Sequence, residues 1–240
     1  MIYYGIPSYK RAFQSKTIDY LSSMGVPRER IILSLQNEAD VRDYTAKGFA
    51  DKATIIQCEG YCVSDNRNNI LDYAERNGIK RLLMLDDDVS GIDVLNSGKY
   101  FRINNEAQLE QLFDFADKHN APIWGTYPLK NAMFQKMQIK LRCIFIGTCI
   151  GFTDMSLRFD NTIRVKEDYE LCLRVISSRR NSIRFDHSAV VASHKSKGGC
   201  ADDWAAGESA KATQELLRRY EGLIRENPKR KGEILMNNLG

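Results

Sequence analysis

Three consecutive aspartates, Asp86, Asp87 and Asp88, follow the apolar run LLML in the segment KRLLMLDDDVSG. If the strand continues through them, side chains alternate between faces, so Asp86 and Asp88 share one face and Asp87 points away. Two carboxylates on one face repel each other unless a cation lies between them. Mg²⁺ or Mn²⁺ binds one or two carboxylates together with substrate phosphate oxygens. The segment therefore predicts a DxD metal–phosphate site, with Asp87 binding structure or nucleoside.

Other interpretations of the aspartates differ in what they require. A simple polar turn would use Ser90 and Gly91 as turn residues. An EF-hand loop starting at Asp86 is excluded, because position twelve is Ser97 where a glutamate is needed. A phosphatase of the haloacid dehalogenase type would use Asp86 as its nucleophile, but its motif normally lies near the start of the domain. The phosphatase stays open as an alternative.

Composition and charge restrict the class of protein. The 240 residues carry a net charge of +4, which permits an anionic ligand without indicating nucleic-acid binding. No apolar run approaches the roughly 20 residues of a membrane span. The first residues lack the basic and long apolar segments of a signal peptide. The six cysteines form no CxxC pair and fit reduced thiols. We therefore expect a protein of the cytoplasm, with no membrane contact.

Short apolar runs alternate with helix-like stretches, which predicts one domain with an α/β layer fold. Strands are expected at 1–7, 30–37, 53–59, 80–88, 121–128, 142–152 and 182–194. Helices are expected at 12–24, 64–78, 105–120, 164–178 and 205–226. The stretch after the aspartates reads as irregular, and the tail at 227–240 reads as polar and loosely held.

The opening segment IYYGIPSYKRA resembles the start of family 2-like nucleotide-sugar glycosyltransferases with the GT-A fold. The resemblance covers most of 1–197. It implies a Rossmann-type three-layer sandwich with a mostly parallel mixed sheet, a nucleotide-binding half at 1–90, an acceptor half at 91–200, and a C-terminal helix and tail at 201–240. It also implies a UDP-sugar donor and Mn²⁺ or Mg²⁺. In such enzymes the end of the first strand lies beside the uracil and ribose, which implies contacts from Pro7, Ser8, Tyr9 and Arg11.

The segment SDNRNNILDYA is similar to the helix that begins beside the nucleotide in this family. The resemblance assigns Asp65, Arg67 and Asn68 to the donor site, and a helix N-terminus suits anionic ligands. The alternative is plain capping of the helix by Ser64 and Asp65.

The segment VKEDYELCL resembles the acidic motif on the acceptor side of these enzymes. The resemblance assigns the base that deprotonates the attacking hydroxyl to Asp168 first and to Glu167 second. Acidic residues in a first helical turn also stabilise the helix dipole, so a purely structural role is the alternative.

The segment VVASHKSKGG places His194 after a strand and before a basic loop. The resemblance implies that His194 completes the metal site. It also implies that Lys195 and Lys197 offset the charge of the departing UDP. A lone histidine is otherwise an ordinary surface or core residue.

The segment PIWGTYP is similar to the phage glycosyltransferases associated with TET/JBP-type base hydroxylases, which glycosylate hydroxymethylated pyrimidines in DNA. This likeness rests on Trp124, Gly125, Tyr127 and Pro128. It implies DNA as acceptor, a host-cell cytoplasm, and a flipped base that stacks on Trp124 or Tyr127. A saccharide or a protein is the competing acceptor, since the usual family 2 acceptor-side tryptophan motif is not evident.

Together these features predict a metal-dependent glycosyltransferase that moves a sugar from a UDP-sugar to an acceptor hydroxyl. The alternatives are the phosphatase with Asp86 as nucleophile and a non-catalytic nucleotide-binding module. The residues leave the sugar, the acceptor, the stereochemistry and the oligomeric state open.

Overall fold

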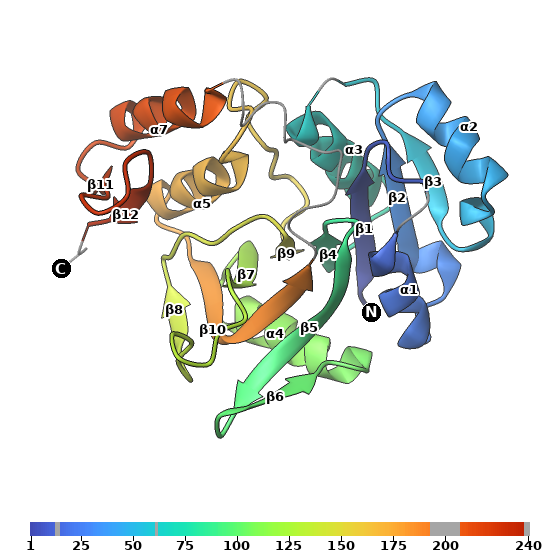
Figure 1. The fold of residues 1–240 in the computed structure, drawn as a ribbon, viewed down its shortest axis with the longest axis horizontal. Helices are drawn as coiled ribbons and strands as arrows, with labels where there is room; N and C mark the ends of the chain where they lie inside the picture. Colours follow the sequence, from blue (N-terminus) through green and yellow to red (C-terminus); the bar gives the residue numbers. More distant parts are fainter. Residues whose placement is uncertain (13–14, 61, 193–206, 238–240) are drawn as a thin grey trace.

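The computed structural model describes residues 1–12, 15–60, 62–192 and 207–237. Its centre is a ten-stranded sheet in the order β3-β2-β1-β4-β9-β7-β10-β5-β6, with β8 paired to β10 (Figure 1). The strands are β1 (Tyr3–Ser8), β2 (Ile31–Leu35), β3 (Thr54–Gln57), β4 (Leu82–Leu85), β5 (Val89–Asn96), β6 (Lys99–Arg102), β7 (Ile123–Tyr127), β8 (Ile139–Leu141), β9 (Cys149–Phe152) and β10 (Ser182–Ala192). The helices are α1 (Lys16–Ser23), α2 (Glu38–Ala46), α3 (Val63–Arg76), α4 (Glu106–Lys118), α5 (Glu167–Ser177) and α7 (Glu208–Arg219).

The strand directions bring the C-terminal ends of several strands to one edge of the sheet. Strands β3, β2, β1 and β4 are parallel, and β10 is parallel to β7. Strand β9 is antiparallel to both β4 and β7, so β4 and β7 run in the same direction. Met84 and Gly125 both pair with Ile150 and therefore lie at the same level. We call the side where β1, β4, β7 and β10 end the carboxyl edge.

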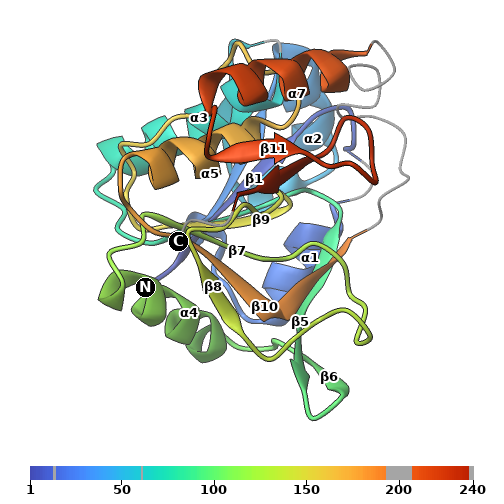
Figure 2. The same ribbon diagram turned by 90° about the vertical axis from the view of Figure 1, so that its left-hand side faces the viewer.

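Alternation along the strands builds two cores, one on each face of the sheet. Leu83 and Leu85 pack with α1 and α4, whereas Leu82 and Met84 pack with α3 and α5. All four side chains are fully buried, and the burial of each stabilises the folded state by about 1.5–3 kcal/mol. Figure 2 shows α4 below the sheet and α3 and α5 above it. The expected three-layer α/β fold is confirmed, in a mixed sheet whose parallel pairings lie mainly in the first 90 residues.

A C-terminal unit covers the outer side of α5. Helix α7 is followed by a small hairpin of β11 (Ile224–Glu226) and β12 (Ile234–Met236). Leu173 of α5 packs against Leu216 and Ile224 of this unit. The expectation of a loosely held tail is wrong for the described part of 227–237, because Ile234 is buried in this small core. The last helix is also shorter than expected and ends at Arg219.

Some of the other expected helices and strands are confirmed, and others are wrong. Helix α4 is confirmed, with Leu109, Leu112, Phe113 and Ala116 all buried. The stretch after the aspartates is not irregular, because β5 and β6 form a hairpin through Ser97 and Gly98, both at positive φ. Two such residues between strands form the tight turns that hairpins favour. The strand expected at 142–152 is reduced to β9.

No helix in the described ranges is long and apolar enough to span a bilayer.

Candidate active site at the carboxyl edge

The three aspartates form a turn, not the end of a strand. Strand β4 stops at Leu85, and Val89 N donates to Asp86 O at 3.5 Å. Thr17 of α1 holds this turn, since its hydroxyl donates to Asp86 O and accepts from Val89 N. The expectation that Asp87 points away from Asp86 and Asp88 because side chains alternate along a strand is therefore wrong, since the three aspartates do not lie in a strand. Asp87 is nevertheless the buried member at 4% exposure, while the side chains of Asp86 and Asp88 are 34% and 16% exposed.

Asp87 fixes the end of β1. Its carboxylate accepts a hydrogen bond from the Ser8 hydroxyl and another from Arg11 Nη1 at 2.5 Å. The Ser8 hydroxyl also lies 2.7 Å from the hydroxyl of Tyr44 on α2. Burial raises the pKa of Asp87 to about 6, although the bonds from Ser8 and Arg11 act in the opposite direction. Both carboxylate oxygens of Asp87 are thus used within the protein.

Arg67 joins the aspartate turn to the start of α5. Arg67 is only 4% exposed, and its guanidinium donates to Glu167 Oε1 at 2.7 Å and to Asp86 Oδ1 at 3.0 Å. It also donates to Gly147 O at 3.2 Å. A Cβ on Gly147 would meet Arg67 Nη1 at 2.4 Å, so only glycine allows this approach. This one buried cation therefore connects Asp86 to Glu167, which lies 100 positions after Arg67 in the chain.

Glu167 and Asp168 occupy the first turn of α5 in different environments. Glu167 is buried against Arg67, whereas Asp168 is partly exposed. The Asp168 carboxylate accepts from Gly147 N at 2.5 Å and from Tyr169 N at 2.8 Å. Burial raises the pKa of both acids, and Arg67 opposes this by favouring their charged forms. Asp168 is therefore the more exposed acid of the pair.

The first turn of α3 serves both the helix and its neighbours. Asp65 accepts from Cys62 N at 3.2 Å, as in a capping box, so the capping alternative is confirmed for this residue. The Asn68 amide bonds both backbone groups of Phe159. Asn66, which sequence reasoning missed, donates to Ser8 O at 3.1 Å, and its Oδ1 is buried without a partner in the described structure. This turn thus fixes the end of β1 and the loop at 159.

The other predicted site residues of the described structure lie at the end of β1 and in β7. Pro7 lies buried inside β1, whereas Tyr9 is partly exposed beyond its end. Trp124 is fully buried against Phe113 and Phe185, so the expectation that it stacks on a flipped base is wrong. Tyr127 is partly exposed, and Arg184 lies over its ring at 5.4 Å.

His194, Lys195 and Lys197 lie outside the described residues. The described part of β10 ends at Ala192, which pairs with Val89 directly after the aspartate turn. Ala192 therefore lies beside the residue that follows Asp88.

The charges of the site favour a bound cation. Five carboxylates gather around two guanidinium groups in the described residues: Asp86, Asp87, Asp88, Glu167 and Asp168 around Arg11 and Arg67. The described part of the chain contains no group of three His, Cys, Asp or Glu side chains arranged to hold a metal by themselves. One or two carboxylates with substrate phosphates are what Mg²⁺ commonly uses. The aspartate turn therefore fits a cation held jointly with a diphosphate.

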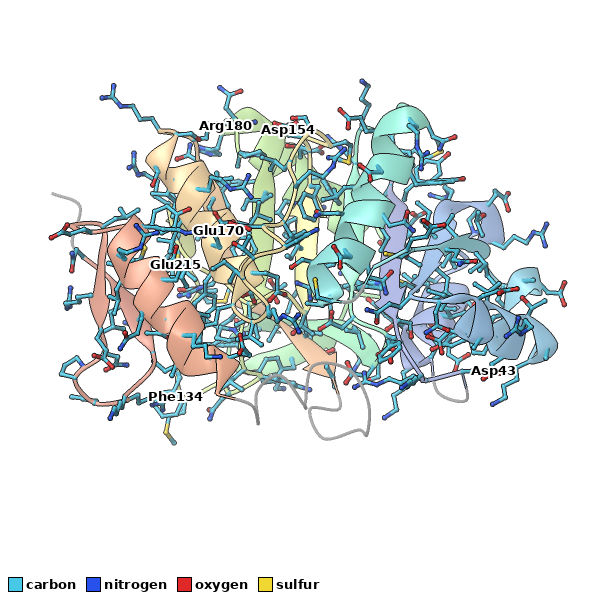
Figure 3. The ribbon with its side chains drawn as sticks, turned by 90° about the horizontal axis from the view of Figure 1, so that it is seen from above. Asp43, Phe134, Asp154, Glu170, Arg180 and Glu215 are labelled. Atoms are coloured by element: carbon cyan, nitrogen blue, oxygen red, sulfur yellow. The ribbon has the colours of Figure 1, made fainter. Side chains whose placement is uncertain are left out.

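A large cavity of about 810 Å³ lies elsewhere, lined by residues that include Lys80, Pro122, Asp154, Arg180 and Asn181. Lys80, Pro122 and Asn181 precede β4, β7 and β10, so this cavity lies at the amino ends of those strands. Figure 3 shows Asp154 and Arg180 at one edge and Phe134 at the opposite edge. Ligands of open α/β sheets bind beyond the carboxyl ends, so we place the active site at the aspartates.

Comparison with solved structures identifies the fold. The fold is similar to S. aureus TarS 1–349, with a TM-score of 0.55, 15% identity, and coverage of 90% of this chain and 65% of that one. The chain thus spans about two thirds of that fragment. It is also similar to glucosyl-3-phosphoglycerate synthase from Mycobacterium tuberculosis in complex with Mn²⁺, UDP and glucosyl-3-phosphoglycerate. There the TM-score is 0.55, with 11% identity and coverage of 95% and 84%. These likenesses show the GT-A glycosyltransferase fold.

The family follows from the sequence. The profile described as "TET-Associated Glycosyltransferase" matches residues 4–199, so the chain belongs to that family of glycosyltransferases. No curated protein sequence matches the chain. Both resemblances seen in the sequence, to GT-A enzymes and to this narrower group, are confirmed.

Proposed function

We propose that this protein transfers a sugar from a UDP-sugar to a hydroxyl group of a hydroxymethylated pyrimidine in DNA, with the help of Mn²⁺ or Mg²⁺. One observation carries the proposal. Arg67 holds the aspartate turn and the first turn of α5 together, so the carboxylates of these two turns lie close to one another. The family supports sugar transfer, and the complexes of TarS with UDP-GlcNAc and of the synthase with UDP support the donor class.

On the donor side, Asp86 and Asp88 would hold the cation, with His194 as the further ligand. When bound, the cation withdraws negative charge from the departing diphosphate. The nucleoside would lie against Tyr9 and Arg11, beyond the end of β1. Asp87, Asp65 and Asn68 act there as positioning residues, because their polar groups hold Ser8, Cys62 and Phe159.

On the acceptor side, Asp168 is the proposed base. It takes the proton of the acceptor hydroxyl as the hydroxyl oxygen bonds to the anomeric carbon and the bond from that carbon to the UDP oxygen breaks. Attack from the side opposite UDP inverts the anomeric configuration. Glu167 positions Asp168 indirectly, by holding Arg67 in place. Lys195 and Lys197 would offset the charge of released UDP.

The decisive experiment uses the whole chain with Mn²⁺, a panel of UDP-sugars and a duplex that contains one 5-hydroxymethylcytosine. We expect a mass gain of one sugar on the DNA and release of UDP, both lost in Asp168→Asn. The matched control is a duplex with 5-methylcytosine, which lacks the hydroxyl. Hydrolysis of p-nitrophenyl phosphate without any sugar transfer would favour the phosphatase alternative with Asp86 as nucleophile. UDP binding without transfer to any hydroxymethylated acceptor would favour the non-catalytic module.

A further inference from the structure

The connection from β7 to β9 borders the active site. It leaves the sheet at Tyr127, the last residue of β7. Met84 and Gly125 lie at the same level, so Tyr127, two residues after Gly125, is level with Asp86, two residues after Met84. It returns at Thr148, whose carbonyl accepts from Asp86 N at 3.1 Å. Its middle part, residues 129–142, is called the rim segment below. Gly147, near the end of the same connection, donates to the Asp168 carboxylate, so the connection that carries the rim segment also contacts the proposed base.

The rim segment exposes an unusual set of side chains. Six large apolar side chains are 37% to 83% exposed: Leu129, Met133, Phe134, Met137, Ile139 and Leu141. The segment contains no Asp or Glu, and its four basic residues are Lys130, Lys136, Lys140 and Arg142. Exposed apolar side chains gathered in this way mark an interaction surface. The accompanying charge selects an anionic partner.

Hydrogen bonds hold the rim segment in shape. The buried Gln135 side chain donates to Asp186 O at 3.2 Å and accepts from Asn131 N at 3.3 Å. Gln138 donates to the Asp186 carboxylate at 2.6 Å. The Asn131 side chain accepts from Met133 N at 3.0 Å and shapes the turn that carries Met133 and Phe134. The two apolar side chains at this turn are therefore exposed by a fixed backbone, and Figure 3 shows Phe134 projecting from the edge of the molecule.

Two of the cations already have partners. Lys130 pairs with Asp93 at 2.6 Å, and Lys140 lies 3.8 Å from Asp186. Lys136 and Arg142 are exposed and form no ion pair within the described residues. These two are the cations best placed to contact an external anion.

We propose that the rim segment is the surface that binds the DNA strand beside the acceptor base, with Phe134 and Met133 as an apolar wedge. This inference rests on the proposed function and specifies its partner surface. Lys136 and Arg142 contact phosphates on either side of the extruded nucleotide. Phe and Met side chains are among those that enter base stacks of kinked DNA, and a flipped pyrimidine leaves such a gap. A rigid wedge beside the catalytic edge suits this role better than a bilayer, which carries no acceptor base to Asp168.

The test measures binding of a fluorescein-labelled duplex with one 5-hydroxymethylcytosine by anisotropy at several salt concentrations. We expect Phe134→Ala to weaken binding about tenfold, as loss of a stacking side chain does. The double variant Lys136→Gln/Arg142→Gln should lower the slope of log Kd against log salt by about 2. Leu235→Ala, on the C-terminal hairpin, and Lys80→Gln, at the opposite edge, are the matched controls and should bind like wild type. All variants should unfold at the wild-type temperature, because these side chains are exposed.

Several results would overturn the proposal. Wild-type DNA affinity and salt slope in the rim variants would do so, and so would binding of the rim to phosphatidylserine vesicles with DNA binding unchanged. Transfer to free 5-hydroxymethyl-2′-deoxycytidine separates this failure from failure of the proposed function. If wild type glycosylates the nucleoside while DNA binding ignores the rim segment, only the docking surface is wrong. If it glycosylates neither the nucleoside nor DNA, the proposed function is wrong.

Discussion

The aspartate turn and the rim segment have opposite chemistry. At the aspartate turn, charged groups are buried or half-buried and are held by Thr17, Ser8 and Arg67. At the rim segment, apolar groups are exposed, and the polar side chains of Gln135 and Gln138 point inward to hold the loop. A prearranged set of charges suits a small anionic donor. A stiff apolar and basic surface suits a polymer that carries the acceptor.

The largest effect is expected at Arg67, which joins the aspartate turn to the first turn of α5. Arg67→Met leaves Glu167 and Asp86 without their buried cation, so the free energy of unfolding should fall by about 3–5 kcal/mol. Urea denaturation of the apo protein measures this. Arg42→Met is the control, because the exposed Arg42–Glu38 pair contributes at most about 0.5 kcal/mol. Equal losses in both variants would show that Arg67 has no special role in joining the aspartate turn to α5.

Substitution of the proposed base should affect turnover far more than folding. Asp168→Asn removes the proton acceptor, so kcat should fall by about 10²–10⁴-fold while UDP affinity in Mn²⁺ changes little. Stability should fall by only about 1 kcal/mol, because one of two accepted backbone bonds is lost. Stopped-time transfer assays and titration calorimetry measure the two quantities. A parallel loss of UDP affinity would mean that Asp168 belongs to the donor site instead.

The same base sets the pH dependence of the reaction. Burial raises the pKa of Asp168 above its ordinary value, and only the deprotonated carboxylate can accept the proton. Activity should therefore be lost as pH falls through a midpoint above the ordinary aspartate value of about 4. The pH profile of kcat/KM measures the midpoint in the free enzyme, and a flat profile down to pH 4 would contradict the assignment of Asp168 as base.

A smaller loss is expected where the end of β1 meets Asp87. Ser8→Ala removes one buried donor to the Asp87 carboxylate and the partner of the Tyr44 hydroxyl, so stability should fall by about 1–3 kcal/mol. Thermal and urea unfolding measure the loss. The exposed Ser22→Ala is the control. If both serines behave alike, the donor side is less tightly prearranged than the structure indicates.

The smallest effect sharpens the contrast with the rim segment. Met137→Ser should change the free energy of unfolding by less than about 0.5 kcal/mol, because Met137 is 62% exposed. Urea denaturation is the measurement. A loss as large as that of Ser8→Ala would show that the rim segment is part of the core rather than a surface.

Much of the fold could be predicted from sequence because the signals were local. Leu109, Leu112, Phe113 and Ala116 repeat at helical spacing, and α4 buries all of them. Trp124 shows the limit, because its place in the likeness to DNA-modifying enzymes gives no information about burial. The β5–β6 hairpin escaped prediction since Ser97, a non-glycine residue, occupies the left-handed region at φ 49.

The site was harder to predict, because it depends on contacts between distant segments. The aspartates and the acids of α5 stood out by residue type and by likeness to a family. The link between them through Arg67 and Gly147 joins positions far apart in the chain. Thr17 gave no signal at all, because a threonine in a helix is ordinary until its hydroxyl is seen to hold the aspartate turn. Such roles follow only from the packing of α1 against the sheet.

The most direct test of the central claim is the affinity for UDP measured by titration calorimetry with and without Mn²⁺. If the aspartate turn holds a cation together with a diphosphate, Mn²⁺ should strengthen UDP binding at least about tenfold in wild type. Asp88→Asn should abolish this dependence, whereas the exposed Asp43→Asn on α2 should retain it. UDP affinity that is equal with and without Mn²⁺, and unchanged in Asp88→Asn, would contradict the account.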